Sequence, residues 1–407
     1  MLLACMFCYL FFYTGRHNFG WAAKNMAAGL KVNFASMGLI SSAMLIGYAV
    51  GQLINGNLAD RFSPRKMIAT GALLSVAANF AISFSHSFTQ ILVLWMLNGY
   101  FQSLAWAPGS RIISNWWARE ERGKAFGFYT MAAGSSSAIT FFISILIVQQ
   151  DTGWQYLFRL PVLFLFGAVV FFYLVVRDKP SDAGMDNLYE DASQQEQTHW
   201  KERYRVVLGN RSFMIASLAI GFESMARYGL IVWVPVHYLG SNWKENPHYL
   251  WTTLLMPLGM ALGALSFGNL SDKLFRHNRP ASIRAGMLIS ALLALFIFLI
   301  PVQNLPLGGF LMFAAGFFVY GPQACFWPMS PDLLGEKYVG TGVGIMNMSA
   351  YLFAALGEPL LGWIIDKTGN SAYVFVAIAV ICLLCAGAIS LVHEGKRTTA
   401  ACTKQLA

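Results

Sequence analysis

Charged residues are scarce in this sequence. They make up 12% of the 407 residues, whereas hydrophobic residues make up 57%. Soluble globular domains carry about a quarter of their residues as charges, so the composition excludes an ordinary soluble domain. The apolar surplus indicates a protein that faces lipid, because a helix needs roughly 20 apolar residues to cross the hydrocarbon core of a bilayer.

The sequence also lacks the groups that an enzyme or a metalloprotein needs. Its six cysteines show no paired metal-ligand spacing, and most lie in apolar stretches where a thiol behaves as a small hydrophobic side chain. No nucleophile–base set stands out. We therefore expect no enzymatic activity, no metal and no cofactor. The first apolar segment has no basic region before it, so we also expect no cleavable signal peptide.

Long apolar stretches bounded by glycine, proline and charged clusters recur along the chain. In lipid only helices and closed barrels satisfy every backbone group, and the short alternating strands of a barrel are absent. The sequence therefore predicts an all-α polytopic membrane protein with twelve transmembrane helices. We expect the spans near 1–22, 36–57, 67–86, 90–113, 123–148, 154–176, 212–239, 249–269, 281–301, 306–332, 339–364 and 371–393.

The positions of the basic residues predict the orientation of the chain. Most of the 28 Lys and Arg residues fall in the connections that follow even-numbered spans, and four fall on the other side: Lys24, Lys31, Lys244 and Lys367. Since cytoplasmic loops collect Lys and Arg, we expect both termini in the cytoplasm. The net charge of +9 then reflects orientation and not nucleic-acid binding. The compact loops favour a bacterial inner membrane, and we expect a monomer in the bilayer.

A polar stretch divides the chain into two similar halves. We expect a six-helix bundle at 1–178, a cytoplasmic linker at 179–210, a second six-helix bundle at 211–395 and a short tail at 396–407.

A sequence repeat supports this division. GNLADRFSPRK follows span 2, and GNLSDKLFRHNR follows span 8. Glycine permits close helix packing, and an acid beside basic residues makes charge-assisted contacts that hold one conformational state. The alternative is a basic loop that only anchors the chain. We predict conformational-switch loops at Gly56, Asp60, Arg61, Arg65, Gly268, Asp272 and Lys273.

Two arginines lie deep within predicted spans. Arg16 is in span 1 and Arg227 is in span 7, the equivalent helix of the second half. A charge near mid-membrane costs roughly 3 kcal/mol or more, so it normally faces a cavity or a partner. Two opposed guanidinium groups suit a phosphate or a carboxylate. Arg111 and Arg159 lie nearer helix ends, where long side chains reach the interface.

Two acids also lie within spans. Glu223 precedes Arg227 by one helical turn, so structural pairing of the two is the alternative to a binding role for Arg227. Glu358 lies in span 11 directly before a proline. Its possible roles are to carry a coupling proton, to contact the solute, or to hydrogen-bond a neighbouring helix.

Four segments carry a resemblance to a known family: FYTGRHNF (12–19), LNGYFQSLAWAPGSR (97–111), RYGLIVWVPVHYL (227–239) and VYGP (319–322). Together with the two parallel halves, they resemble the organophosphate:inorganic phosphate antiporter family of the major facilitator superfamily. The resemblance covers nearly the whole chain, and the segment with Asn98, Gln102, Trp106 and Pro108 is its most specific part. It implies two pseudo-symmetric six-helix bundles that alternate access to a central site.

The resemblance also implies which residues bind the solute. The paired phosphate-binding arginines of the family match Arg16 and Arg227. The predicted substrate-binding residues are Arg16, Arg227, Tyr9, Tyr13, Tyr48, Gln52, Trp106, Tyr320 and Tyr351, and Glu223 and Glu358 are candidates for coupling or substrate contact. Two positions depart from well-studied bacterial members: Gln52 stands where they carry a lysine, and Ala133 where they carry a histidine. The pocket is therefore less positive.

These features predict a secondary transporter that exchanges a small organophosphate for inorganic phosphate. The less positive pocket favours a solute that is less anionic, zwitterionic, or larger with polar groups. One alternative is proton-coupled symport of an organic anion, with Glu223 or Glu358 as the proton carrier. Another is a transporter-like sensor of a sugar phosphate, which would need a signalling partner.

Overall fold

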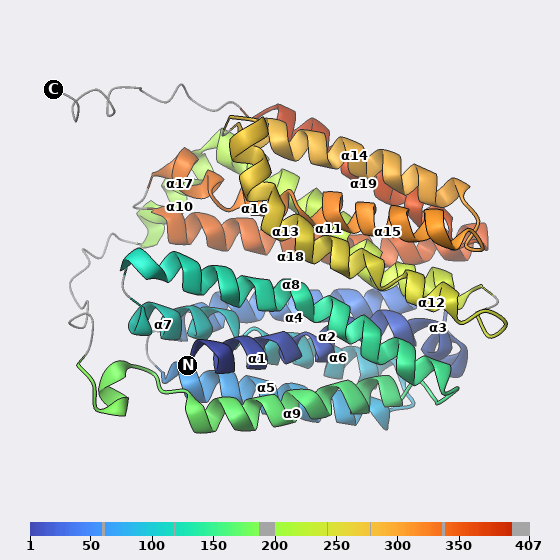
Figure 1. The fold of residues 1–407 in the computed structure, drawn as a ribbon, viewed down its shortest axis with the longest axis horizontal. Coiled ribbons are helices and arrows are strands. Elements are labelled where there is room, and N and C mark those ends of the chain that lie inside the picture. Colours follow the sequence, from blue (N-terminus) through green and yellow to red (C-terminus); the bar gives the residue numbers. More distant parts are fainter. Residues whose placement is uncertain are drawn as a thin grey trace.

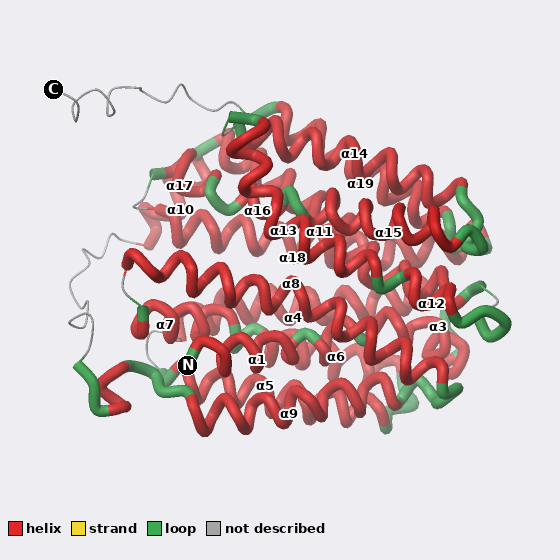
Figure 2. Tube along the Cα trace, in the orientation of Figure 1, coloured by secondary structure: helices red, strands yellow, loops and turns green. Residues whose placement is uncertain are grey.

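The computed structural model describes residues 1–58, 62–117, 119–186, 200–241, 243–276, 278–335 and 338–392. Within these ranges it contains helices and no strand. Figure 1 shows the blue-to-green helices of the earlier half of the chain in one layer and the yellow-to-red helices of the later half in another. The connections gather at the two ends of the helices (Figure 2). We call the end that carries Met1 and the end of the last helix the termini side, and the opposite end the far side.

The first half begins with an interrupted helix. Predicted span 1 is divided into three consecutive pieces, and predicted span 4 is divided into two by a turn over residues 103–105. The helices of this half are α1 (Leu2–Phe12), α2 (Thr14–His17), α3 (Phe19–Leu30), α4 (Phe34–Leu58), α5 (Pro64–Ser83), α6 (Phe88–Gln102), α7 (Trp106–Trp116), α8 (Arg119–Gln149) and α9 (Tyr156–Val175).

The region that connects the halves contains a short 3-10 helix η1 (Pro180–Ala183) and α10 (Trp200–Gly209), and residues 187–199 lie outside the described residues. The predicted tail at 396–407 also lies outside them. The second half consists of α11 (Arg211–Leu239), α12 (His248–Thr252), α13 (Leu255–Leu274), α14 (Arg279–Leu299), α15 (Leu305–Tyr320), α16 (Gln323–Phe326), α17 (Met329–Leu334), α18 (Val339–Thr368) and α19 (Tyr373–Ser390).

The predicted all-α polytopic membrane fold is confirmed. In the described parts of the chain, 9 helical segments are long and apolar enough to cross a bilayer, and they match nine of the twelve predicted spans. Spans 1 and 4 are interrupted in the structure. Span 5 lies in the continuous helix α8, whose apolar segment within the described residues is Gly134–Gln149.

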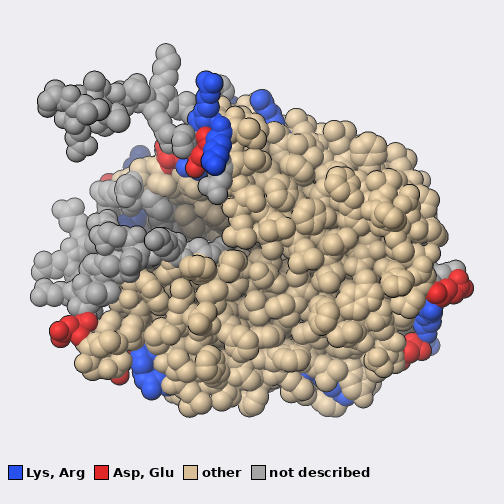
Figure 3. Space-filling model, viewed as in Figure 1, with Lys and Arg blue, Asp and Glu red and all other residues tan. Residues whose placement is uncertain are grey.

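Large apolar side chains cover the outside of the molecule. On α9, for example, Leu163, Phe164 and Phe171 are each about half exposed. Figure 3 shows that charged residues on the visible face gather mainly toward the two ends, with a broad uncharged region between them. Such a band satisfies the requirement of a bilayer, whose hydrocarbon core excludes unpaired charges.

The two halves repeat the same close helix contacts. In the first half, a Cβ atom added at Gly99 of α6 would lie 2.0 Å from the carbonyl oxygen of Met44 of α4. In the second half, a Cβ added at Gly316 of α15 would lie 2.0 Å from the carbonyl oxygen of Met256 of α13. Only glycine permits this approach of two helices. The pairs occupy equivalent places, spans 2 and 4 and spans 8 and 10, so the repeat extends to the packing.

The halves meet tightly on the far side. There α4 packs against α18, and a Cβ added at Gly38 of α4 would lie 2.4 Å from the carbonyl oxygen of Glu358. Likewise α3 packs against α11, where a Cβ at Gly20 would lie 2.8 Å from the carbonyl oxygen of Val232. We call the contact of α4 with α18 and of α3 with α11 the seam. Its glycines bring backbones of opposite halves into direct contact.

Polar contacts between the halves also lie on the far side. The carboxylate of Asp366, near the end of α18, accepts hydrogen bonds from the backbone N–H groups of Phe34 and Ala35 at 2.9 and 2.8 Å, and so caps the start of α4 from the opposite half. Lys244 pairs with Asp151 at 2.8 Å. The Lys24 ammonium group donates to the carbonyl oxygen of Leu239. The far side is therefore closed.

The predicted switch loops lie on the termini side. Arg65 makes its contacts within its own half: its Nε donates to the carbonyl oxygen of Tyr173 at 3.0 Å, and its backbone N–H donates to Asp178 at 2.7 Å. No heavy atom lies within 4 Å of a Cβ added at Gly268, and Asp272 and Lys273 are exposed. Gly56 lies in α4, whereas Asp60 and Arg61 are outside the described residues.

Candidate functional site

A cavity of about 290 Å³ lies between the halves, on the termini side of the seam. Tyr48 of α4 and Tyr351 of α18, whose ring centroids are 4.5 Å apart, separate it from the seam. Its walls are mostly aromatic, with a few neutral polar groups and one charged side chain. The lining residues are Tyr9, Tyr13, Tyr48, Trp106, Arg227, Tyr320, Gln323, Trp327, Val343, Asn347 and Tyr351.

Arg227 supplies the charge of the cavity wall. It projects from the middle of α11, and its guanidinium carbon lies 4.6 Å from the ring centroid of Tyr228 and 5.1 Å from that of Tyr320. Its Nε makes no hydrogen bond. A cation over the faces of aromatic rings gains about 0.5–2 kcal/mol for each contact, which partly offsets the loss of its hydration. Arg227 therefore lines the cavity as a cation, with its buried Nε left without a hydrogen-bond partner.

Arg16 lies directly behind this wall. It is 5% exposed, and its guanidinium carbon is 4.4 Å from the ring centroid of Tyr48, with Tyr13, Tyr228 and Tyr351 within 5.4 Å. Its Nε and Nη2 atoms make no hydrogen bond. Burying an unpaired charge costs several kcal/mol, so the site holds Arg16 in a state that an anion would stabilise.

The two arginines share one aromatic ring. Tyr228 lies against Arg16 from α2 and against Arg227 from α11, so the charges of the two halves converge at the closed end of the cavity. The sequence predicted this convergence from the equivalence of spans 1 and 7.

The break in span 1 orients Arg16. Gly15 has a non-helical backbone (φ −84°, ψ 16°), so nearby carbonyl groups lose their helical partners. Side chains from α6 replace them: Asn98 Nδ2 donates to the carbonyl oxygen of Gly15 at 2.9 Å, and Gln102 Nε2 donates to that of Phe12 at 3.0 Å. Buried carbonyl groups require such partners. The polar residues of the family-like segment in span 4 therefore support the helix that carries Arg16.

A second layer of hydrogen bonds fixes these amides. Ser75 Oγ donates to Asn98 Oδ1 at 2.6 Å, and Asn79 Nδ2 donates to the same oxygen at 3.2 Å. On the other side of the break, Asn18 Nδ2 donates to the carbonyl oxygen of Leu157 at 2.8 Å. All of these side chains are buried, so the network is shielded from water and holds one geometry.

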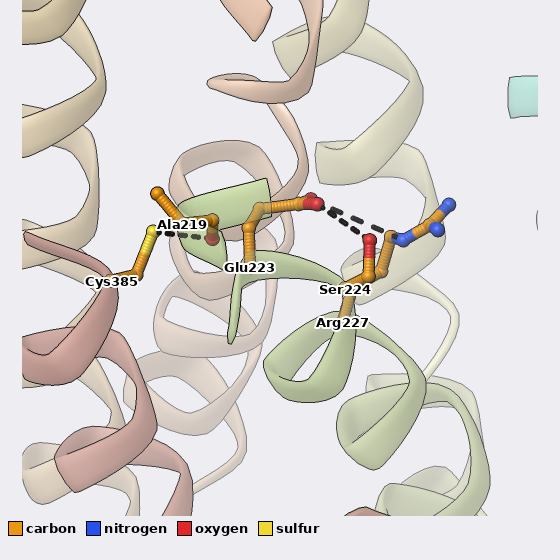
Figure 4. A network of polar contacts seen from close by, with 5 residues as sticks. All are labelled: Ala219, Glu223, Ser224, Arg227 and Cys385. Atoms are coloured by element: carbon orange, nitrogen blue, oxygen red, sulfur yellow. Dashed lines mark hydrogen bonds and ion pairs between the residues drawn. The ribbon is translucent and has the colours of Figure 1, made fainter. Parts of the chain in front are cut away.

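Glu223 accompanies Arg227 on α11. Its Oε1 lies 4.0 Å from Arg227 Nε, and its Oε2 accepts a hydrogen bond from Ser224 Oγ at 2.9 Å. Figure 4 shows the carboxyl group pointing toward both partners, while Cys385 contacts the carbonyl group of Ala219 on the same helix. Glu223 is fully buried and does not line the cavity. It reduces the positive charge that a bound anion would meet.

Two other predicted residues lie away from the cavity. Glu358 is 1% exposed within the seam and does not line the cavity, which does not favour the predicted substrate contact in this conformation. Gln52 on α4 is also absent from the lining, and its Nε2 is buried without a partner. The side chain at Ala133 lies outside the described residues.

Tyr9, Tyr13 and Trp106 form the wall contributed by the first half. The hydroxyl groups of Tyr9 and Tyr13 are 3.3 Å apart, and the Tyr9 ring stacks on Tyr129 with centroids 4.4 Å apart. Trp106 stacks on the same Tyr129 ring at 5.8 Å. These rings give the cavity a rigid apolar wall with hydroxyl groups at its edge.

Several lining residues were not predicted from the sequence. Gln323 follows the VYGP segment, and Asn347 is a polar residue inside an apolar span, which is a signal of the same kind that identified Glu358. Trp327 and Val343 carry no such signal, because aromatic and aliphatic residues are common in membrane helices. In the part of the chain that the structure describes, no three His, Cys, Asp or Glu residues form a group able to hold a metal ion.

Known proteins similar to this chain include membrane transporters and a "Membrane sensor protein UhpC" of Salmonella typhimurium, which is 26% identical over 94% of this chain and 90% of its own length. A "Probable hexose phosphate transport protein" of Chlamydia pneumoniae is 26% identical over 91% of this chain and 85% of its own length. The "Glycerol-3-phosphate transporter" of Bacillus subtilis is 24% identical over 96% of this chain and 91% of its own length. These relatives agree with the family resemblance seen in the sequence.

A solved structure shares the fold. A bacterial homologue of the human lysosomal transporter Spinster, in an inward-facing and unoccupied conformation, superimposes with a TM-score of 0.79 at 17% identity, covering 96% of each chain. The sequence profile described as Major Facilitator Superfamily matches residues 5–358. The chain therefore belongs to the Major Facilitator Superfamily.

Proposed function

We propose that this protein exchanges an organophosphate for inorganic phosphate across a membrane by alternating access. The observation that carries the proposal is the convergence of Arg16 and Arg227 on the Tyr228 ring, at the closed end of a cavity between the halves. Both guanidinium groups retain donors without hydrogen-bond partners. Planar arginine donors match the oxygens of a phosphate group, and arginine keeps its charge at every physiological pH.

The positions of the two arginines suggest an order of events. A phosphate that enters the cavity first meets Arg227, because Arg16 lies behind the rings of Tyr13, Tyr48 and Tyr351. Movement of these rings then gives the phosphate access to Arg16 in the other half. A ligand changes a conformational equilibrium only through its different affinities for the two states. The bridge between halves is the contact that would favour closure around the substrate.

The cavity wall favours an ester with an uncharged organic part. Aromatic rings and the amides of Gln323 and Asn347 surround the entrance to Arg227, and no second cation lines the cavity among the described residues. Glu223 reduces the local charge further. Sugar and polyol groups have apolar faces that stack on aromatic rings and hydroxyl groups that bond to amides. The names of the sugar- and glycerol-phosphate transporters among the relatives support the same class.

We also propose an orientation and a division into moving bodies. The positive charges of the connecting loops support a cytoplasmic termini side, so the closed far side would be extracytoplasmic and the structure inward-open. Residues 1–178 and 211–395 would rock about the cavity as two bodies, joined by the linker at 179–210. We place the protein in a bacterial inner membrane as a monomer.

The test is exchange of radiolabelled phosphate in proteoliposomes preloaded with phosphate. We expect exchange by the parent and at least a hundredfold loss in Arg16→Lys and in Arg227→Lys, because lysine cannot form the bidentate contact. Arg159→Lys is the control. Arg159 lies in the first turn of α9, on the far side and away from the cavity, and donates to Ser83 at 2.9 Å. A correctly folded parent without exchange would contradict the proposal and favour a carboxylate substrate or a sensor.

A further inference from the structure

Glu358 lies in the seam without the partners that a carboxylate needs. Its side chain is 1% exposed, and neither Oε1 nor Oε2 accepts a hydrogen bond. The indole N–H of Trp233 on α11 and the hydroxyl of Ser41 on α4 face the carboxyl group and interact with it, but neither reaches it with the geometry of a full hydrogen bond. The Trp233 Nε1 atom is itself buried without a hydrogen-bond partner. An ionised carboxylate in such a place is strongly disfavoured, whereas a protonated carboxyl group is tolerated.

No counter-charge pairs with this carboxyl group. Among the described residues, no Lys, Arg or His lies within ion-pair distance of Glu358. Arg16 and His17 line a small void together with Ser41 and the seam residues Gly20 and Val232, and Glu358 is not among its lining residues. The titratable and charged groups on the helices packed around Glu358 are Tyr48 of α4, Arg211, Glu223, Arg227, Tyr228, His237 and Tyr238 of α11, Tyr351, Asp366 and Lys367 of α18, Arg16 and His17 of α2, Lys24 of α3, and Tyr373, Cys382 and Cys385 of α19.

The two helices of the seam pack closely at Glu358. The backbone of Glu358 packs against Gly38, where even a methyl group would lie 2.4 Å from the Glu358 carbonyl oxygen. One turn earlier on α18, the carbonyl oxygen of Ala355 accepts a hydrogen bond from Ser42 Oγ at 2.6 Å. Closing the seam therefore strips water from Glu358 and brings it no charged partner.

The route of solvent to Glu358 follows from the fold. The cavity on the termini side ends at Tyr48 and Tyr351, and Glu358 is not among its lining residues. Alternating access requires the halves to part along the seam when the far side opens. Glu358 then meets water from the far side, and it is sealed from both sides in the conformation seen here.

We propose that Glu358 is a proton-binding site that exchanges protons only with the far side, and that a bound proton is required to close the seam. This proposal rests on the proposed function, because it needs alternating access. The proton binds from the far side when the seam is open, stays on the carboxyl oxygen while the seam is closed, and returns to the far side. The proton controls closure of the seam and is not itself carried across the membrane. The transport rate would therefore depend on pH at one face only.

The test measures access to the seam without requiring transport. Ser42→Cys, in a Cys402→Ser background, places a thiol inside the seam, where a membrane-impermeant maleimide reaches it only when the seam opens. The five described cysteines are buried, so they contribute little background labelling. Deprotonation of one group changes a linked equilibrium by up to tenfold per pH unit. Because the thiolate is the reactive form, the labelling rate at each pH is divided by that of an exposed far-side thiol, Gln303→Cys in the same background. We expect this ratio to rise about tenfold between external pH 6 and 9, and to stay constant when only the internal pH changes.

Substitutions at Glu358 separate the site from general effects of pH. Glu358→Gln mimics the protonated carboxyl group and should give low labelling at every external pH. Glu358→Asp keeps a titratable group and should keep the pH dependence, which provides a second test if the glutamine variant does not fold. Glu223→Gln removes the other buried acid and should leave the pH dependence intact.

Each outcome has a definite meaning. Labelling that ignores external pH in the parent, or that keeps its pH dependence in Glu358→Gln, overturns the proton site. A response to internal pH overturns the claim that protons exchange on one side only. If inorganic phosphate fails to exchange while Glu358-dependent labelling persists, the proposed substrate is wrong and the proton site stands.

Discussion

Glu223 and Arg227 lie one turn apart on α11, with Oε1 of the acid 4.0 Å from Nε of the arginine. This separation is too long for a strong hydrogen-bonded pair, and the Arg227 Nε atom makes no hydrogen bond. The acid therefore moderates the charge of Arg227 and leaves its donors available to a ligand.

Removal of this acid should strengthen anion binding. In Glu223→Gln we expect the KM for phosphate exchange to fall roughly tenfold, equivalent to about 1.4 kcal/mol, because Arg227 is no longer partly neutralised. Ser224→Ala, which removes only the hydrogen bond to Glu223, is the matched control and should change KM far less. An unchanged or higher KM in folded Glu223→Gln would show that the acid does not moderate the site.

The amide of Asn98 should be required to position Arg16. Asn98→Ala removes the 2.9 Å hydrogen bond to the carbonyl oxygen of Gly15, and an unsatisfied buried carbonyl costs about 1–3 kcal/mol. We expect kcat/KM for exchange to fall roughly tenfold to a hundredfold while the protein still inserts and folds. Asn55→Ala is the control, since buried Asn55 bonds to Ser103 and not to span 1. Equal effects in both variants would point to a general loss of stability.

A larger residue at Gly38 should force the seam apart. In Gly38→Ala the new methyl group would lie 2.4 Å from the carbonyl oxygen of Glu358, so α4 and α18 must separate. Spin labels on the exposed far-side residues Gln90 and Gln303 report the separation of the halves by pulsed electron paramagnetic resonance. We expect a longer distance in Gly38→Ala. Gly344→Ala, on the same α18 with nothing within 4 Å of the added atom, should match the parent.

The cap that Asp366 provides should hold the far side closed. Loss of a helix cap costs about 1 kcal/mol, which changes a two-state population about fivefold. In Asp366→Ala we therefore expect the same spin labels to show a larger fraction of long distances. Asp151→Ala is the comparison, because the Asp151–Lys244 pair is largely exposed, with side-chain exposures of 75% and 64%, and such pairs contribute little. A larger effect in Asp151→Ala would contradict this assignment.

Much of the fold was predictable because its signals are local. Each apolar stretch must become a helix in lipid whatever surrounds it, and the predicted spans agree with the helices in most places. The interruption of spans 1 and 4 was not predicted. It depends on Asn98, Gln102 and their partners, which satisfy carbonyl groups of a helix many residues away.

Membership of the superfamily also confirms that the chain is not an enzyme.

The residues of the candidate site were likewise predictable only in part. Arg16 and Arg227 were predicted because a charge inside an apolar span is costly wherever it lies, and the structure places both against Tyr228. Glu358 gave the same kind of signal, yet its environment was left open by the sequence. Only the packing of α4 against α18 puts it in the seam and not in the cavity.

The sequence by itself determined the membrane-spanning helices, the two related halves and the buried charges, because hydropathy and the cost of burying a charge act on each residue separately. The tertiary structure decided which side is closed, which arginine lines the cavity and which acid lies between the halves. Those features arise from contacts such as Asp366 with the start of α4 and Gly38 with Glu358, which join residues more than 300 positions apart. No local pattern encodes such pairings, since each depends on how the two bundles meet.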